Sequence, residues 1–116
     1  MVNGDGAFGL NGFDFDTFVR FNIPVVSVVG NDRQWGQIIV GQKAMYGKDR
    51  AIASRLGDNC RYDKIVEGMG GHGEYVTKPD EIRPAIERAF ASGKPACVNV
   101  IMDQEPPGIM GGYEFM

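Results

Sequence analysis

Two short stretches of the sequence place acidic side chains next to glycine. The first is GDG, centred on Asp5 near the start of the chain, and the second is GND at residues 30–32. Mg²⁺ prefers hard oxygen ligands and is commonly held by one or two carboxylates, with substrate phosphates and water completing its shell. If the fold brings Asp5 and Asp32 together, they therefore predict a magnesium site for a phosphate-bearing ligand.

The strands before these two stretches determine whether the acids can meet. The run PVVSVVG at residues 24–30 is continuously apolar and β-branched, which predicts a strand covered on both faces. GDG follows a shorter strand at the start of the chain. In an open parallel sheet, ligands bind at the carboxyl ends of the strands. We therefore expect Asp5 and Asp32 to lie close together although they are far apart in the sequence.

The glycines of GDG predict a close approach between the backbone and an anion. Glycine adopts positive φ without steric cost, so the N–H groups around Gly6, Ala7 and Phe8 can point at a phosphate group. GDG alone is a weak signal, because a three-residue match arises often by chance. Together with GND on a parallel sheet the signal is much stronger, and it predicts a metal-bound diphosphate.

Strands and helices alternate along the rest of the chain. The patterns predict a helix at 13–22, the strand at 24–30, two helices of which the second spans 64–71, a strand at 73–77, a helix at 80–93 and a strand at 95–102. This alternation predicts right-handed βαβ units and a parallel sheet. The expected fold class is α/β, with three layers (αβα) around a mostly parallel sheet.

Two apolar patterns predict which helix faces are buried. The helix at 80–93 carries one stripe formed by Ile82, Ile86, Ala89 and Phe90. An aromatic run is expected to pack the first helix against the sheet, and it consists of Phe13, Phe15, Phe18 and Phe21.

The length, charge and composition of the chain exclude several classes of protein. A chain of 116 residues forms one domain with a modest core and is short for a complete cofactor enzyme. The 12 basic and 15 acidic residues give a net charge of -3 with no basic block, which argues against a nucleic-acid partner. No apolar run approaches the roughly 18 residues of a membrane span. The start of the chain lacks a secretory pattern, and Cys60 and Cys97 fit reduced thiols, so we expect a cytoplasmic location.

The stretch from GDG to ND resembles the thiamin diphosphate-binding motif, which runs from GDG to a closing pair, usually Asn-Asn. The resemblance covers GDGAFGLNGFDFDTFVRFNIPVVSVVGNDRQWGQI and the later GKPACVNVIM. These segments are similar to the C-terminal, diphosphate-binding domain of the acetolactate synthase-like group. GND followed by tryptophan is most similar to the branch of 2-hydroxyacyl-CoA lyases and acetolactate synthase-like enzymes.

The resemblance implies roles for individual residues. The implied Mg²⁺ ligands are Asp5, Asp32 and the backbone carbonyl of Gln34. The implied cofactor-binding residues are Gly4, Gly6, Ala7, Phe8 and Asn31 around the diphosphate, with Gln34, Trp35, Gly36 and Gln37 in the loop that approaches the thiazolium ring or the substrate pocket. Asp32 stands where the family usually has asparagine. A second carboxylate attracts Mg²⁺ and also repels the diphosphate, and we expect cofactor binding to survive the change.

The resemblance also implies a function. The cofactors are thiamin diphosphate and Mg²⁺, the reaction is the breaking or forming of a C–C bond, and the substrate is a 2-oxo acid, an aldehyde or an acyl-CoA. The family's catalytic glutamate lies in an N-terminal pyrimidine-binding domain, so no catalytic residue is assigned here. We expect a fold truncated on its N-terminal side, belonging to a longer homodimeric or homotetrameric enzyme or completed by a partner chain. Residues 1–103 form the cofactor domain, and residues 104–116 form an irregular arm.

Several alternatives stay open at this point. One alternative is a non-catalytic α/β module that acts only in association with another chain. The sequence does not separate the synthase, lyase and FAD-binding variants of the family. Trp35 could line a substrate pocket or anchor the core. His72 could be a general base, although a solvated turn residue is favoured. The charge run of Lys43, Lys48, Asp49 and Arg50 could meet the acidic part of a CoA substrate, although an exposed charged face is favoured.

Overall fold

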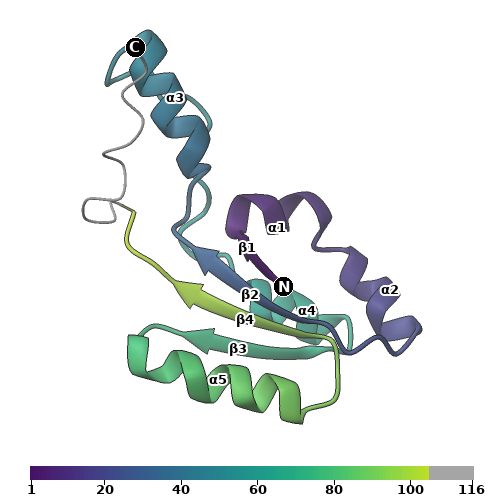
Figure 1. The fold of residues 1–116 in the computed structure, drawn as a ribbon. Coiled ribbons are helices and arrows are strands. Elements are labelled where there is room, and N and C mark those ends of the chain that lie inside the picture. Colours follow the sequence, from purple (N-terminus) through teal and green to yellow (C-terminus); the bar gives the residue numbers. More distant parts are fainter. Residues whose placement is uncertain (105–116) are drawn as a thin grey trace.

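A computed structural model describes residues 1–104 of the chain (Figure 1). Helices and strands alternate in it as the sequence predicts, with one additional helix that begins within GDG, at Asp5. In chain order the elements are β1 (Val2–Gly4), α1 (Asp5–Asn11), α2 (Asp14–Arg20), β2 (Val26–Asn31), α3 (Gly36–Tyr46), α4 (Tyr62–Gly68), β3 (His72–Val76), α5 (Pro79–Ala91) and β4 (Ala96–Ile101).

The described strands form one sheet in the order β1-β2-β4-β3, and every neighbouring pair is parallel. The register aligns Gly4 with Gly30 and Asn31 with Ile101. The carboxyl ends of β1, β2 and β4 therefore lie side by side at one edge. The prediction of an α/β fold with a parallel sheet is confirmed.

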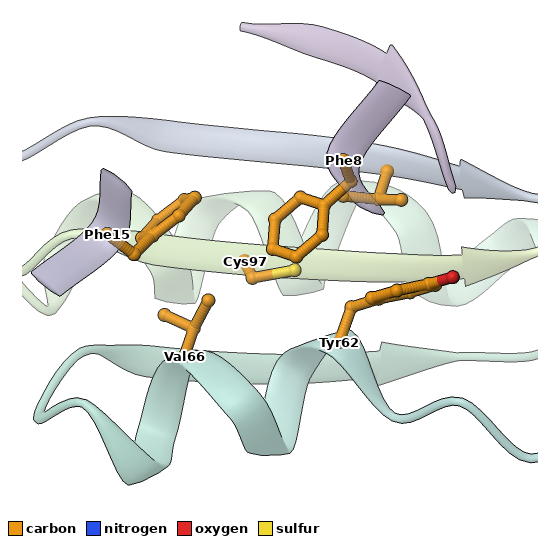
Figure 2. Packing of buried hydrophobic residues seen from close by; sticks show 6 residues of the cluster. Phe8, Phe15, Tyr62, Val66 and Cys97 are labelled. Carbon is orange, nitrogen blue, oxygen red and sulfur yellow. The ribbon is translucent and has the colours of Figure 1, made fainter. Parts of the chain in front are cut away.

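Helices cover both faces of the sheet (Figure 1). Helices α1, α2 and α4 lie over one face and α5 lies over the other. Two apolar clusters fill the spaces between these layers. The cluster beneath α1, α2 and α4 consists of Phe8, Phe15, Val29, Tyr62, Val66 and Cys97 (Figure 2). The cluster beneath α5 consists of Val26, Val76, Ala85, Ala89, Ala96 and Val98. The predicted three-layer αβα arrangement is thus confirmed.

The predicted apolar faces of the helices α2 and α5 are both wrong in part. Phe15 is buried and Phe18 packs against the same cluster, since they are three residues apart on one face of α2. Phe13 and Phe21 cap the two ends of α2 and are 80% and 68% exposed. On α5 the buried stripe contains Ala85 and Ala89, whereas Phe90 points away from it and is 66% exposed.

Helix α3 extends beyond the carboxyl end of β2, away from the sheet (Figure 1). Ile39 is its one fully buried residue, while the apolar side chains of Ile38, Met45 and Tyr46 are exposed. Along residues 1–104, no helix combines the length and apolar character that a membrane crossing requires. The predicted irregular arm at 104–116 lies outside the described residues, apart from Gln104.

Candidate functional site

The fold brings the GDG and GND stretches together at the carboxyl edge of the sheet. Asp5 is the first residue of α1 and follows the last residue of β1, while Asp32 follows the last residue of β2. Because β1 and β2 are adjacent, the two carboxylates are close enough for the negative charge of Asp32 to act on the pKa of Asp5. The predicted meeting of the two acids is therefore observed.

Asp5 is a buried carboxylate with one unused oxygen. Asp5 as a whole is 1% exposed to solvent. Its Oδ1 accepts a hydrogen bond from the Gly6 N–H at 2.9 Å, and its Oδ2 is buried without a partner among residues 1–104. Burial raises the pKa of Asp5 and the charge of Asp32 raises it further, although the N–H groups of Gly6 and Arg33 oppose the shift.

This donor set fits a divalent cation. A buried polar atom without a partner is rare in proteins and needs an explanation. Two neighbouring carboxylates repel each other when both are ionised, and a bound cation removes that repulsion while also satisfying the unused oxygen. Asp5 Oδ2 together with Asp32 can therefore supply hard oxygen ligands to Mg²⁺.

The loop after β2 holds Asp32 in a compact turn. Its Oδ1 accepts from the Gln34 backbone N–H at 3.3 Å, and its Oδ2 accepts from the Gln34 Nε2 at 3.2 Å. Gly36 begins α3 so close to Asp32 that a Cβ there would lie 3.3 Å from Oδ2. Within this turn Arg33 adopts φ 59°, a left-handed conformation that is unusual for arginine. The turn is therefore strained at the residue next to Asp32.

Trp35 connects this loop to α1. Its backbone N–H donates to the Ser54 carbonyl at 2.8 Å, and its indole ring lies over Gly6. A Cβ at Gly6 would lie 3.3 Å from the ring carbon Cδ2, so any larger residue at this position would press on the ring. Trp35 is half-buried and packs against Gly6, and its role in lining the site stays a prediction.

The predicted positive φ around GDG is wrong. Gly4 is extended, with φ -78° and ψ 162°, and Gly6 is not among the positive-φ glycines of the described chain. The reason is that α1 begins directly at Asp5, so the backbone passes from strand to helix without a left-handed residue. A Cβ at Gly4 would have no atom within 4 Å, which leaves open space beside this residue.

The other predicted cofactor-binding residues differ in what they expose. Ala7 and Gln37 are exposed, and Gly36 is half-buried. The Phe8 ring packs in the core at 5.1 Å from the ring of Tyr62, so its side chain is not available to a ligand (Figure 2). The Asn31 side chain is buried and donates to Asn99 Oδ1 at 3.0 Å.

Sequence reasoning missed a buried polar network behind the site. Asn99 Nδ2 donates to Asp63 Oδ1 at 3.1 Å, and Arg61 NH2 donates to Asp63 Oδ2 at 2.6 Å. Burial alone would raise the pKa of Asp63, but hydrogen bonds from Arg61 and Asn99 outweigh it and hold the pKa below its usual range. One signal was present in the sequence, because Asn99 interrupts an apolar strand where a polar side chain needs a partner.

The lowered pKa of Asp63 predicts a loss of stability in acid. A carboxyl group with a depressed folded pKa stabilises the protein above its unfolded pKa, which is near 4, and this contribution is lost as the pH falls through the folded value. We expect Asp63→Asn to lower the free energy of unfolding at pH 7 by about 1.5–3 kcal/mol, the range for hydrogen bonds to a charged group. Urea unfolding across pH 2–7 tests this prediction. A difference between the two proteins that stays constant down to pH 2 would contradict it.

His72 lies away from the site. It begins β3, at the opposite end of the sheet, and its Nε2 lies 2.9 Å from Glu74 Oε1. Glu74 also binds Arg88, which lowers the pKa of the glutamate. The structure thus places His72 on a strand, hydrogen-bonded to Glu74, rather than in a turn. Lys43, Lys48 and Arg50 are exposed on and after α3.

Comparisons with known proteins give a consistent result. The family model described as thiamine pyrophosphate enzyme, C-terminal TPP binding domain, matches residues 1–100. The chain is 50% identical over 103 residues to an acetolactate synthase large subunit of Mycobacterium tuberculosis, covering 89% of this chain and 18% of that protein. It is 38% identical over 109 residues to a 2-hydroxyacyl-CoA lyase of Arabidopsis thaliana, covering 88% and 18%.

A third relative and a solved structure agree with these matches. An oxalyl-CoA decarboxylase of Escherichia coli K12 is 35% identical over 103 residues, covering 88% of this chain and 18% of the relative. A thiamine diphosphate-dependent 4-hydroxybenzoylformate decarboxylase of Rhodococcus jostii RHA1 matches with a TM-score of 0.78 at 20% identity, over 88% of this chain and 19% of that one. This likeness shows the fold. The chain spans less than a fifth of the length of the curated relatives.

Proposed function

Since the chain belongs to the thiamine pyrophosphate enzymes, as their C-terminal TPP-binding domain, we propose that it forms the Mg²⁺ and diphosphate half of the active site of a C–C bond lyase or carboligase. Thiamin diphosphate with Mg²⁺ is the cofactor of this family. The observation that carries the proposal is the unused, buried Oδ2 of Asp5 beside the carboxylate of Asp32.

In this proposal Asp5, Asp32 and the Gln34 carbonyl are the metal ligands. The first N–H groups of a helix have no acceptor within the helix. In α1 the Gly6 N–H already donates to Asp5 Oδ1, so the other N–H groups at the start of the helix are the ones proposed to bind the diphosphate. Gly4, Gly6, Ala7 and Phe8 supply backbone here, while Asn31 supports the loop. Gln34, Trp35, Gly36 and Gln37 form the side of the site toward the reacting ring. When bound, thiamin diphosphate would supply the nucleophilic carbon and the electron sink that breaking or forming a C–C bond requires.

The substrate class follows from the relatives. Their names include an acetolactate synthase, a 2-hydroxyacyl-CoA lyase and an oxalyl-CoA decarboxylase. For this chain we propose a 2-oxo acid, an aldehyde or an acyl-CoA as the substrate. The alternative of a non-catalytic module is not favoured, because the family match runs through both GDG and GND.

The same proposal includes a larger assembly. A pyrimidine-binding domain, from the same polypeptide or a partner chain, would complete each site in a homodimer or homotetramer. Exposed apolar side chains support such contacts: Val2 on the edge strand β1 is 84% exposed, and Met45 and Tyr46 on α3 are 70% and 66% exposed. The cofactor domain is proposed to end at residue 103. The free thiols of Cys60 and Cys97 support a cytoplasmic location.

Calorimetric titration of the chain with thiamin diphosphate, with and without Mg²⁺, tests the proposed function. We expect saturable binding that requires Mg²⁺ and is absent from the Asp5→Ala, Asp32→Ala double variant. Circular dichroism of each protein verifies that it is folded. Equal binding by the double variant, or no binding by the folded wild-type chain, would contradict the proposal that this chain anchors the diphosphate.

A further inference from the structure

A continuous series of buried polar side chains connects α4 to the loop that carries Asp32. It runs from Asp63 through Asn99 on β4 and Asn31 on β2 to the backbone N–H of Arg33. Asp63, Asn99 and Asn31 are 1%, 0% and 2% exposed. We call this series the relay.

Every hydrogen bond in the relay points toward Asp63. The Arg33 N–H donates to Asn31 Oδ1 at 3.2 Å, the Asn31 amide donates to Asn99 Oδ1 at 3.0 Å, and the Asn99 amide donates to Asp63 Oδ1 at 3.1 Å. Bonds aligned in this way polarise one another, and the effect is larger in a buried environment. Because both asparagines use their oxygen and their nitrogen, their orientations are fixed by the series itself.

Asp63 gives the relay a charged end. Arg61 holds its carboxylate with three contacts, at 3.0, 3.2 and 2.6 Å. The guanidinium of Arg61 is partly exposed and lies 3.9 Å from the centre of the Tyr75 ring, which fixes its orientation. The acceptor at the end of the relay is thus ionised and rigidly placed.

The other end of the relay reaches the proposed metal site. The Arg33 N–H that donates to Asn31 also acts on the carboxylate of Asp5, whose pKa it lowers. Arg33 is the residue with φ 59° in the turn after Asp32. A left-handed arginine is costly and persists where its surroundings hold it in place, and the relay supplies a fixed acceptor for its amide.

We infer that Asp63 and Asn99 are positioning residues for the Mg²⁺ site, because through Asn31 they hold the Arg33 turn that sets Asp32 opposite Asp5. The inference rests on the proposed function for the identity of the bound group. The position and stability of the turn itself can be measured without any ligand. Replacing residues that hold the ligands of a metal in place commonly lowers the affinity for the metal by about 10–100-fold.

Trp35 reports the position of the turn directly. It is the one tryptophan of the chain, and its ring lies over Gly6 at the start of α1. If the turn moves away from α1, the ring gains contact with water and its emission shifts to longer wavelength. Hydrogen exchange of the Arg33 amide gives a second, independent measure of the same turn.

Two variants break the relay and two are matched controls. Asn99→Leu and Asp63→Leu keep the approximate side-chain volume but remove an acceptor. Val98→Ala removes apolar contacts of the residue next to Asn99 on β4. Val98 packs on the face toward α5, so this change does not touch the relay. Asp63→Asn removes the charge but keeps an oxygen that can accept from Asn99. The controls therefore lose stability while the turn stays in place.

The expected result is a red shift of the Trp35 emission and at least about 10-fold faster exchange of the Arg33 amide in the two leucine variants, but not in the two controls. With thiamin diphosphate present, the leucine variants should need about 10–100-fold more Mg²⁺ for half-saturation. The inference would be overturned if the leucine variants kept the Trp35 emission and the Arg33 amide exchange rate of the wild-type chain. It would also be overturned if Val98→Ala shifted the Trp35 emission as far as the leucine variants do.

Two further outcomes separate the inference from the proposed function. If the leucine variants fail to fold, exchange in the wild-type chain decides: an Arg33 amide as slow as the amides of β2 supports the relay, and one as fast as an unstructured amide overturns it. If the wild-type chain binds no Mg²⁺ and cofactor, the proposed function fails, and the emission and exchange of the ligand-free proteins still decide whether the relay positions the turn.

Discussion

Replacing Asp5 with asparagine is expected to abolish Mg²⁺-dependent cofactor binding while stabilising the metal-free chain. Binding should weaken by at least about 100-fold, because the variant loses the carboxylate that the metal needs. The metal-free protein should gain about 1–2 kcal/mol, since a buried carboxylate with an unused oxygen beside a second carboxylate is unfavourable. The new amide can instead donate a hydrogen bond to Asp32.

Calorimetry with Mg²⁺ and thiamin diphosphate measures the first effect, and urea unfolding in a chelator measures the second. Asp14→Asn is the matched control, because it makes the same change at an exposed position of α2. It should leave binding unchanged and lower stability by no more than about 1 kcal/mol, the range for a carboxylate in the first turn of a helix. Opposite signs for binding and stability are typical of a residue kept for a ligand at a cost to the fold. A loss of stability in the Asp5→Asn chain would contradict this account of Asp5.

Replacing Phe15 with alanine is expected to cost about 3–5 kcal/mol, the range for a buried phenylalanine. Phe15 is 1% exposed, and its ring packs 5.7 Å from the ring of Phe8 (Figure 2). It also packs 5.4 Å from the ring of Phe18. A domain of this size has a total stability of about 5–15 kcal/mol, so the variant should be close to unfolding. The loss should also loosen α1, because Phe8 anchors that helix.

Phe13→Ala is the control for this prediction, since the same atoms are removed from a residue that is 80% exposed. Its cost should stay within about 0.5 kcal/mol. Urea unfolding followed by circular dichroism compares the two variants. Equal losses would show that α2 packs with a different face toward the sheet.

The features that the sequence predicted correctly depend on local patterns. The β-branched run at 24–30 predicts β2 without reference to the rest of the chain, and the chain order of strands and helices predicts a parallel sheet. From there the meeting of Asp5 and Asp32 follows, because both stand at strand ends. The α5 stripe was predicted in part for the same reason, although Phe90 falls beside the stripe rather than on it.

The features that the sequence did not predict depend on contacts between distant residues. Asp63 looks like an ordinary acidic residue at the start of a helix, and its burial becomes evident when α4 packs against β4 and brings it to Asn99. The left-handed Arg33 has no local signal, since arginine has no preference for that conformation. The glycines of GDG suggested positive φ. Instead, Gly6 lies close to the ring of Trp35, which is distant in the sequence, and a Cβ at Gly6 would be tightly packed against that ring.

The most direct test of the central claim is to locate the metal. A crystal of the chain grown with thiamin diphosphate and Mn²⁺ in place of Mg²⁺ allows the ion to be located by its anomalous scattering. The account predicts one strong peak bonded to Asp5 Oδ2 and to the Asp32 carboxylate, at the carboxyl ends of β1 and β2. A fully occupied Mn²⁺ bonded to neither carboxylate, with the cofactor bound elsewhere on the chain, would contradict it.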